Sequence, residues 1–247
     1  MSLPDVALLS GLIFLAAVIY SSVGHAGASG YIAAMALFGL SPTVMKPTAL
    51  ALNILVAILA TYRWHSAGLV RWKALPPLLI TSIPMAFLGG AIHLPFSWYK
   101  AVVGVILLLA AAKFFVQPRE TAAAPAQAGV PWAGGAAAGA GVGFLSGLTG
   151  TGGGIFLSPI LLLCGWAGLR QAAGITAPFI LANSVAGLAG SIMSLNSLPK
   201  ELPVFLAAAL LGALAGTQLG IGWIPAKQLQ RVLALVLAIA GVKFLLT

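Results

Sequence analysis

Two long stretches without a charged side chain constrain this chain more than any other feature of its sequence. No Asp, Glu, Lys or Arg occurs in the 40 residues between Asp5 and Lys46, or in the 49 residues between Glu120 and Arg170. A helix needs about 20 apolar residues to cross the hydrocarbon core of a bilayer. Each stretch is therefore long enough to hold more than one membrane segment.

The composition excludes several classes of protein. Only 6% of the 247 residues are charged, whereas soluble domains carry about 25%. The 12 basic and 3 acidic side chains cannot cover a globular surface, which excludes a soluble enzyme and a disordered chain. The basic residues are scattered singly, so the net charge of +9 indicates no nucleic-acid partner. Cys164 is the only cysteine, which excludes an intrachain disulfide and a cysteine-based metal cluster.

Glycine-rich runs interrupt both stretches, at 24–30 and 147–154. Glycine at this density weakens a helix, so each stretch is expected to form two shorter helices around a break. Residues 1–5 lack the basic region of a secretory signal, and we expect the first apolar segment to be retained. The sequence thus predicts an all-α, polytopic membrane protein. Its ten segments are expected at 6–23, 30–40, 47–62, 74–92, 98–116, 133–148, 153–164, 172–193, 202–222 and 227–246.

The two halves of the chain resemble each other, which indicates an internal duplication. Several residues recur at an offset of 130, and the glycine runs recur at an offset of 123. The matching pairs are Asn53 and Asn183, Gly90 and Gly220, Pro95 and Pro225, Lys113-Phe114 and Lys243-Phe244, and Gly24, Gly27 and Gly30 with Gly147, Gly150 and Gly153. We therefore divide the chain into a first transmembrane repeat (1–116), a linker rich in proline and alanine (117–131), and a second repeat (132–247).

Basic loops predict how the repeats are oriented. The loop 63–73 carries three basic residues, whereas its counterpart 194–201 carries one beside an acid. The bias reverses in the next pair of loops, where 224–231 carries two basic residues and 93–100 carries one. Because positive loops tend to stay in the cytoplasm, five segments in each half give an inverted-topology repeat. Both termini are then expected outside.

The predicted segments contain no Asp or Glu. Proton pumps and many cation-coupled carriers use buried carboxylates, and no such residue is available here. His25, His65 and His93 are far apart in sequence, and only His25 lies within a break. An intramembrane enzyme is therefore not expected, and neither is a metal site or a cofactor.

The breaks suit the binding of an anion. A helix that begins inside the membrane leaves free backbone N–H groups and the positive end of its dipole, and glycine lets these donors approach a ligand closely. Broken helices at corresponding positions of two repeats point to a transporter site. The candidate substrate-binding residues are Ser22, His25, Gly27, Ser29, Gly30, Asn53, Thr149, Gly150, Thr151, Gly152, Gly153 and Asn183.

Several of these residues also have a purely structural interpretation. Membrane glycines often serve close packing, and we interpret Gly143, Gly147 and the series Gly212, Gly216 and Gly220 in this way. Asn53 and Asn183 could tie helices together, and His25 could be a structural hydrogen bonder.

Residues near the segment ends are expected to mark the membrane boundary. Lys46 and Arg170 are expected to be interfacial anchors. An interfacial aromatic belt is expected from Trp64, Trp72, Trp98, Tyr99, Trp132, Trp166 and Trp223.

The second glycine run carries a family resemblance. Residues 147–159, GLTGTGGGIFLSP, look like the signature of the TauE/SafE sulfite exporters, a family of transporters for small sulfur-containing anions. The stretch 170–176 is similar to the basic residue and Gly-Thr element that follow in that family. The resemblance implies a multi-pass protein of the bacterial inner membrane that moves anions such as sulfite or sulfoacetate. It places Thr149 to Gly153 at the site, with Gly27, Ser29 and Gly30 as the counterpart.

The leading hypothesis is a secondary transporter, and more specifically an exporter, with alternating access around a midplane anion site. Its expected partners are the small anionic substrate and membrane lipid, and a homodimer is allowed. Two other functions stay open: a passive anion channel built from the same helix ends, and a membrane scaffold that transports nothing.

Overall fold

The computed structural model describes residues 1–92, 95–116 and 129–222, together with residues 234–235, 238, 241–242 and 245. The expected segment 227–246, most of the linker 117–131, and His93, Trp223 and Lys227 lie largely or wholly outside the described residues. In the described part every regular element is a helix. The elements are α1 (Leu3–Ser22), α2 (Ala28–Leu37), α3 (Pro42–Ser66), η1 (Trp72–Ala74), α4 (Pro76–Ala91), α5 (Phe96–Val116), α6 (Trp132–Thr149), α7 (Gly154–Leu163), α8 (Leu169–Gly190), η2 (Ile192–Ser197) and α9 (Leu202–Gly222).

The all-helical, multi-pass prediction is confirmed. Among the described residues α1, α3, α8 and α9 contain apolar stretches long enough to cross a membrane, while α2 and α4 are shorter apolar helices. Many large apolar side chains lie on the outside of the bundle, among them Leu8, Ile80 and Leu211, which are 64%, 64% and 59% exposed. Such a surface is costly in water and suits lipid.

Several expected segments begin earlier than the sequence suggested, among them those at 47–62 and 172–193. The segment expected at 47–62 is α3, which starts at Pro42 because Ser41 has extended backbone and the proline occupies the first turn. Pro47 thus lies inside the helix rather than at its start. The segment expected at 172–193 is α8, which spans Leu169–Gly190 and is followed by the separate short helix η2.

Glycine ridges hold the bundle together across the two halves. A Cβ atom at Gly139, Gly143 or Gly147 of α6 would collide with the backbone of Leu78, Ser82 or Ala86 of α4, respectively. On the other side of the bundle the corresponding series lies on α9. There Gly212, Gly216 and Gly220 meet the backbone of Phe14, Val18 and Ser22 of α1. The packing role predicted for these glycines is confirmed.

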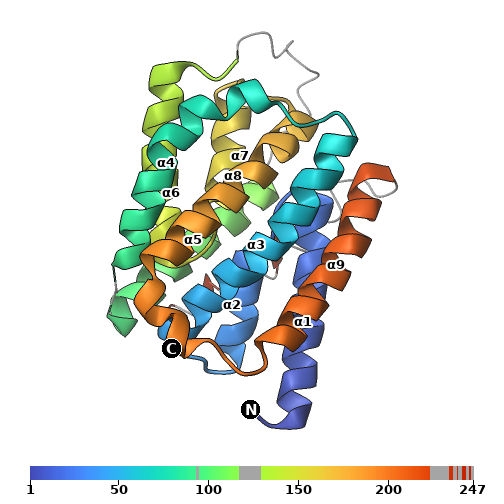
Figure 1. Cartoon of the computed structure of the whole chain (residues 1–247), viewed down its shortest axis with the longest axis vertical. Helices are drawn as coiled ribbons and strands as arrows, with labels where there is room; N and C mark the ends of the chain where they lie inside the picture. Colours follow the sequence, from blue (N-terminus) through green and yellow to red (C-terminus); the bar gives the residue numbers. More distant parts are fainter. Residues whose placement is uncertain are drawn as a thin grey trace.

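The order of these contacts fixes the helix directions. Residue numbers rise together along both pairs, so α4 runs parallel to α6 and α1 runs parallel to α9. The fourth helix of each half therefore packs on the first helix of the other half. In Figure 1, α1 rises from the N-terminus whereas α6 descends, although the two occupy corresponding places in their halves.

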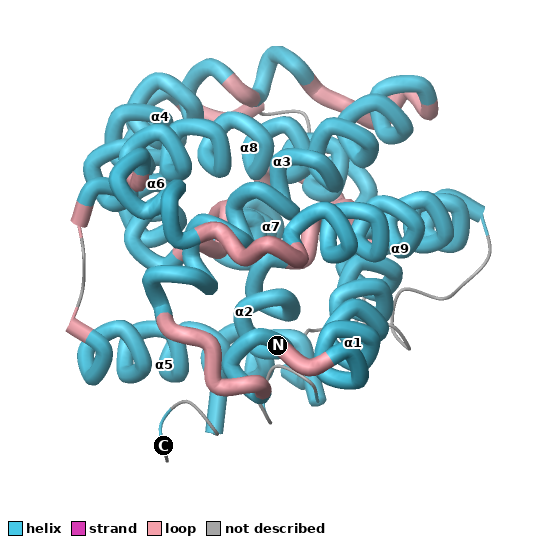
Figure 2. Tube along the Cα trace, turned by 60° about the horizontal axis from the view of Figure 1, so that its bottom comes forward, coloured by secondary structure: helices cyan, strands magenta, loops and turns pink. Residues whose placement is uncertain are grey.

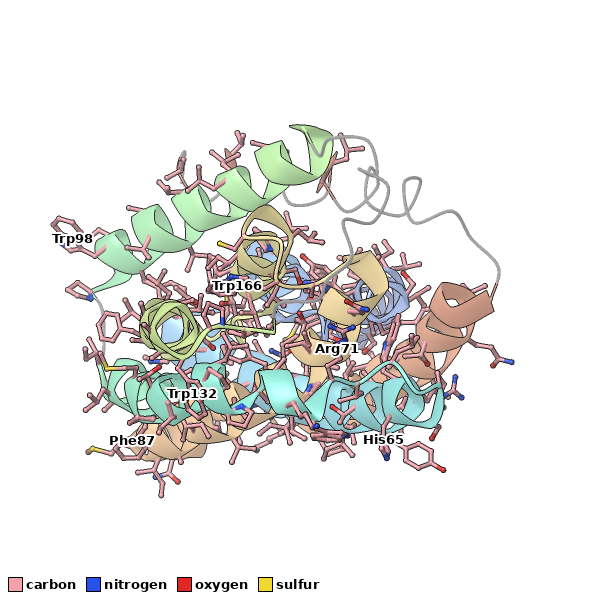
Figure 3. The ribbon with its side chains drawn as sticks, turned by 90° about the horizontal axis from the view of Figure 1, so that it is seen from above. His65, Arg71, Phe87, Trp98, Trp132 and Trp166 are labelled. Carbon is pink, nitrogen blue, oxygen red and sulfur yellow. The ribbon has the colours of Figure 1, made fainter. Side chains whose placement is uncertain are left out.

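The short helices α2 and α7 lie inside the bundle, surrounded by longer helices in Figure 2. Figure 1 places α2 in the lower half of the molecule and α7 in the upper half. Ala28 to Met35 of α2 are all buried. By contrast, α5 lies along one edge of the bundle, and Trp98 near its start points outward in Figure 3.

The aromatic residues divide into two groups. Trp72, Trp98 and Trp132 are 49%, 67% and 64% exposed, which fits an interfacial belt. Trp64 and Tyr99 are buried, at 3% and 2% exposure, so their assignment to the belt is wrong. Each lies near a helix end, but the packing of neighbouring helices turns it inward.

Orientation in the membrane stays a prediction that cysteine labelling tests. In a Cys164→Ser background, we expect Ser197→Cys to react with an impermeant maleimide added to intact cells. Ser66→Cys should react only after permeabilisation, because the basic loop 63–73 is expected inside. Labelling of both positions from one side would contradict the inverted repeat.

Candidate functional site

The first break separates α1 from α2. Ser22 ends α1, and Gly24 and Gly27 adopt φ angles of 78° and 104°. Residues other than glycine rarely adopt a positive φ, because their Cβ atom clashes with the backbone. These two glycines therefore stop the helix and redirect the chain. Gly27 then occupies the N-cap position of α2, where no side chain caps the first turn.

The second break separates α6 from α7 in the same manner. Gly150, Gly152 and Gly153 have φ angles of 81°, 76° and 81°. Gly150 ends α6 in the left-handed conformation, and Gly153 is the N-cap residue of α7 without a side-chain cap. The helix interruptions predicted from the glycine runs are therefore present in both halves.

Both breaks carry backbone donors for which the described residues supply no acceptor. Within the described residues, no hydrogen-bond partner is found for the N–H groups of residues 26–30 or of residues 151–155. All ten residues are buried. An unpaired buried donor costs about 1–3 kcal/mol, whereas consecutive N–H groups at a helix start form a concave site for anions. The described part of the chain thus holds two buried runs of donors to which it offers no partner.

His25 joins the two breaks. Its Nε2 atom lies 3.1 Å from the carbonyl oxygen of Gly154, the first residue of α7. The same atom lies 3.0 Å from Oγ of Ser158, one turn further along α7. On the other side of the ring, Nδ1 lies 3.1 Å from the carbonyl oxygen of Val23. The two glycine runs, which are more than 120 residues apart in sequence, are therefore in contact.

Helices α3 and α8 close the second break. A Cβ atom at Gly152 would collide with Nδ2 of Asn53 and lie 3.0 Å from Oγ of Ser184. Nδ2 of Asn53 donates to the carbonyl oxygen of Thr151 and to Oγ of Ser184, each at 3.4 Å. Ile180 of α8 lies against Gly154. Residues from α3 and α8 thus fix the path of the chain through the break.

The side-chain NH₂ groups of the two asparagines already donate hydrogen bonds, so only their Oδ1 atoms are left, and these are acceptors. Nδ2 of Asn183 donates to Oγ of Ser82 at 3.2 Å and to the carbonyl oxygen of Phe179 at 2.9 Å. Both asparagine side chains are fully buried, and their Oδ1 atoms have no partner among the described residues. Asn53 touches the second break, whereas Asn183 contacts α4, so the structure does not bring the two together at one break.

Most of the predicted hydroxyl donors are engaged within the protein. Ser22 donates to the carbonyl oxygen of Ile19, and Thr149 donates to that of Leu145. Thr151 pairs with Thr149 at 2.9 Å, and Ser29 pairs with Tyr20 at 2.5 Å. The groups left to bind an anion are therefore mainly backbone N–H groups.

Two predicted residues serve packing. The carbonyl oxygen of Ser22 lies against Gly220 of α9, and Gly30 lets α2 approach Ala16 and Tyr20 of α1. Gly27 is covered by the ring of Tyr31, whose hydroxyl donates to the carbonyl oxygen of Ala26 at 2.6 Å.

Lys46 is a buried residue of the site region and not the interfacial anchor expected from its position. It is 8% exposed, and its Nζ donates to the carbonyl oxygens of Gly89, Gly90 and Ile92 at 3.3, 2.8 and 3.2 Å. A cation is favourable at the C-terminal end of a helix, here α4. Its side chain also packs against Gly150 of the second break. Arg170 cannot be compared with it, because the side chain of Arg170 is not described.

The sequence analysis noted Ser158 and Thr176 only as parts of motifs, and neither as a candidate site residue. Oγ of Ser158 lies 3.1 Å from Oγ1 of Thr176 on α8. Ser158 is the one hydroxyl residue on the otherwise apolar helix α7. A lone polar residue in such a helix is itself a signal of function or of a helix–helix contact.

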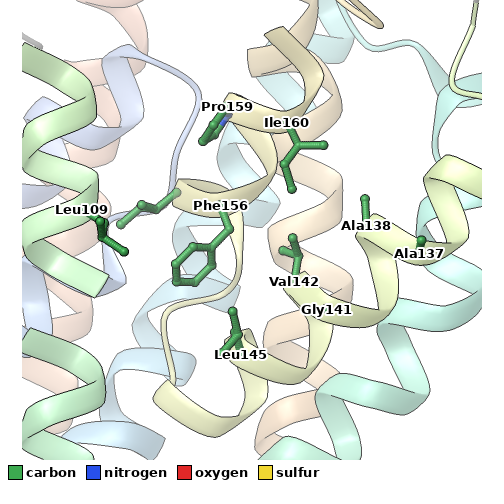
Figure 4. A pocket seen from close by; sticks show the side chains of 10 residues that line it. Leu109, Ala137, Ala138, Gly141, Val142, Leu145, Phe156, Pro159 and Ile160 are labelled. Atoms are coloured by element: carbon green, nitrogen blue, oxygen red, sulfur yellow. The ribbon is translucent and has the colours of Figure 1, made fainter. Parts of the chain in front are cut away.

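An apolar pocket of about 480 Å³ lies between α5, α6 and α7 and reaches Ile155 at the edge of the second break. Its lining includes Leu109, Val142, Leu145, Phe156 and Ile160, as Figure 4 shows. These side chains offer no donor to an anion, so we place the candidate site at the breaks and not in this pocket.

Comparisons with known proteins identify relatives of the chain. The sequence profile of the family described as "Sulfite exporter TauE/SafE" matches residues 9–244. The chain is 40% identical, over 238 residues, to the "Probable membrane transporter protein y4hK" of Sinorhizobium fredii (strain NBRC 101917 / NGR234). This match covers 94% of the chain and 95% of the relative. No solved structure shows significant similarity to the chain.

Proposed function

The chain belongs to the TauE/SafE family of sulfite exporters and is a multi-pass membrane transporter, and on this premise we propose that it exports small anions such as sulfite or sulfoacetate by alternating access. The anion would bind between the two helix breaks, where it would accept hydrogen bonds from the N–H groups of residues 26–30 and 151–155. Because these donors are neutral, they can hold an anion without the tight ion pair that would oppose its release.

One observation carries this proposal: the two runs of backbone donors are buried and have no acceptor among the residues that the structure describes. A bound anion would satisfy many of them at once, whereas a cation would be repelled by their positive ends. The side chain of Lys46 passes beside Gly150 through its Cγ atom, while its ammonium group donates to carbonyl oxygens at the end of α4.

Burial of both breaks also favours a carrier over a channel. A channel needs a continuous path along which the ion leaves as easily as it enters, but all residues of 150–155 are buried. Export also agrees with the electric field. Moving one negative charge out of a negative cytoplasm releases about 2.3 kcal/mol for each 100 mV.

Purified protein in liposomes tests the proposal. We expect saturable uptake of radiolabelled sulfite or sulfoacetate, faster when the opposite side holds the unlabelled anion. Acceleration of this kind indicates a carrier, whereas large unitary currents would favour a channel. Equal radioactivity in protein-containing and empty liposomes, for every sulfur oxyanion and sulfonate tried, would contradict anion transport.

A further inference from the structure

We propose that Ser146 donates a side-chain hydrogen bond to the anion, so that the substrate at the second break is held by this hydroxyl as well as by backbone N–H groups. This inference rests on the proposed function and adds a substrate-binding residue to the same site. Ser146 lies in the last turn of α6, one turn before Gly150 ends that helix. It is not among the candidate residues selected from the sequence.

The side chain of Ser146 lies against the start of α7. A Cβ atom placed on Gly153, the N-cap residue of α7, would lie 3.3 Å from Cβ of Ser146. The other two nearest atoms, at 3.0 and 3.1 Å, belong to the apolar side chains of Val142 and Phe179. Ser146 is therefore the polar member of the three side chains that surround this helix start most closely.

The hydroxyl of Ser146 is buried without a partner in the described part of the chain. The residue is 0% exposed, and its Oγ atom has no hydrogen bond to any described residue. A serine in a helix can donate to the carbonyl oxygen one turn earlier, as Ser21 of α1 does to Ala17. Ser146 does not form this bond. Because an unpaired buried hydroxyl costs stability, a ligand that accepts a hydrogen bond would offset a cost that the protein already carries.

The surroundings of Ser146 suit an acceptor with negative charge. The N–H groups of residues 151–155 lie at the start of α7, where the helix dipole is positive, and the described residues supply no acceptor for them. A sulfite ion or a sulfo group has several oxygen atoms, so it can accept from these N–H groups and from the hydroxyl at once. Val142 and Phe179 keep water away from this position, and a hydrogen bond is electrostatically stronger in such a medium.

The hydroxyl groups beside the start of α2 are engaged within the protein. Gly27, the N-cap residue of α2, is covered by the ring of Tyr31, whose hydroxyl donates to the carbonyl oxygen of Ala26. The hydroxyl of Ser29 pairs with that of Tyr20. We therefore assign the side-chain donor of the site to the second break, where the hydroxyl of Ser146 is available.

The test measures the binding of sulfite and of sulfoacetate to purified Ser146→Ala protein in detergent. We expect both dissociation constants to rise by about tenfold or more, because a hydrogen bond to a charged group is lost. The matched control is Ser21→Ala, which also removes one buried hydroxyl from the last turn of a helix. Since that hydroxyl already donates to the carbonyl oxygen of Ala17, its loss should leave both dissociation constants unchanged.

Melting temperatures separate a binding role from a structural one. Without anion, Ser146→Ala should melt no lower than the wild type, since the variant removes an unpaired buried hydroxyl. At equal concentrations of anion, the melting temperature should rise less in the variant than in the wild type, because the variant binds more weakly.

Two results would overturn the role of Ser146 and leave the proposed function intact. One is an unchanged pair of dissociation constants in Ser146→Ala. The other is a lower melting temperature of this variant without anion, which would show that the hydroxyl already has a partner in the protein. Failure of the wild type to bind either anion would instead overturn the proposed function, and the role of Ser146 together with it.

Discussion

Replacing Gly152 with alanine should nearly abolish anion transport, whereas replacing Gly165 with alanine should leave it intact. Both glycines have positive φ, 76° and 66°, so both variants carry the same type of backbone strain, about 1–2 kcal/mol. They differ in the space around the new methyl group. At Gly152 it would collide with Nδ2 of Asn53 and approach Ile180, whereas at Gly165 no atom lies within 4 Å.

The collision at Gly152 moves the donors of the second break. Asn53 holds the carbonyl oxygen of Thr151, so displacement of its amide changes the path of the chain that carries the N–H groups of 151–155. We expect uptake to fall by about tenfold or more, in line with the 1–3 kcal/mol that overpacking costs. Protein amount and monodispersity in detergent show whether each variant is folded.

A folded Gly152→Ala protein with wild-type uptake would contradict a site at the second break. Equal losses in Gly152→Ala and Gly165→Ala would mean that backbone strain, and not the position of the donors, limits transport. The comparison therefore separates the geometry of the break from the general cost of removing a glycine.

The sequence predicted the helices well where the conformation of a segment depends on its own residues. Charge-free stretches indicated more than one segment each, and glycine runs indicated the breaks, because the conformation of a glycine depends mainly on its own backbone. The expected segment 153–164 thus corresponds to Gly154–Leu163. The expected segment 47–62 begins at Pro47, whereas α3 begins five residues earlier, at Pro42.

Contacts between distant segments could not be predicted in this way. The pairing of His25 with Ser158 spans 133 residues, and the burial of Lys46 depends on where α4 ends. Neither contact can be inferred from the spacing of residues along a single helix. For Asn53 the sequence suggested a place beside a break. Only the structure shows that its NH₂ group is engaged, whereas its oxygen has no partner among the described residues.

Gly147→Val should destabilise the whole protein, whereas Gly141→Val, on another face of the same helix, should not. A Cβ atom at Gly147 would collide with the carbonyl oxygen of Ala86 and lie 2.8 Å from the backbone nitrogen of Gly90. At Gly141 no atom lies within 4 Å. Valine carries the same small helix penalty at both positions, so the difference between the variants isolates the contact between α6 and α4.

The effect should be large because α4 and α6 come from different halves of the chain. Backbone atoms cannot move aside as a flexible side chain can, so α4 must separate from α6 along the ridge formed by Gly139, Gly143 and Gly147. We expect a cost of about 3 kcal/mol or more. It is measured as the difference in melting temperature between the two variants in detergent. Equal melting temperatures would show that the close approach of these two helices does not hold the halves together.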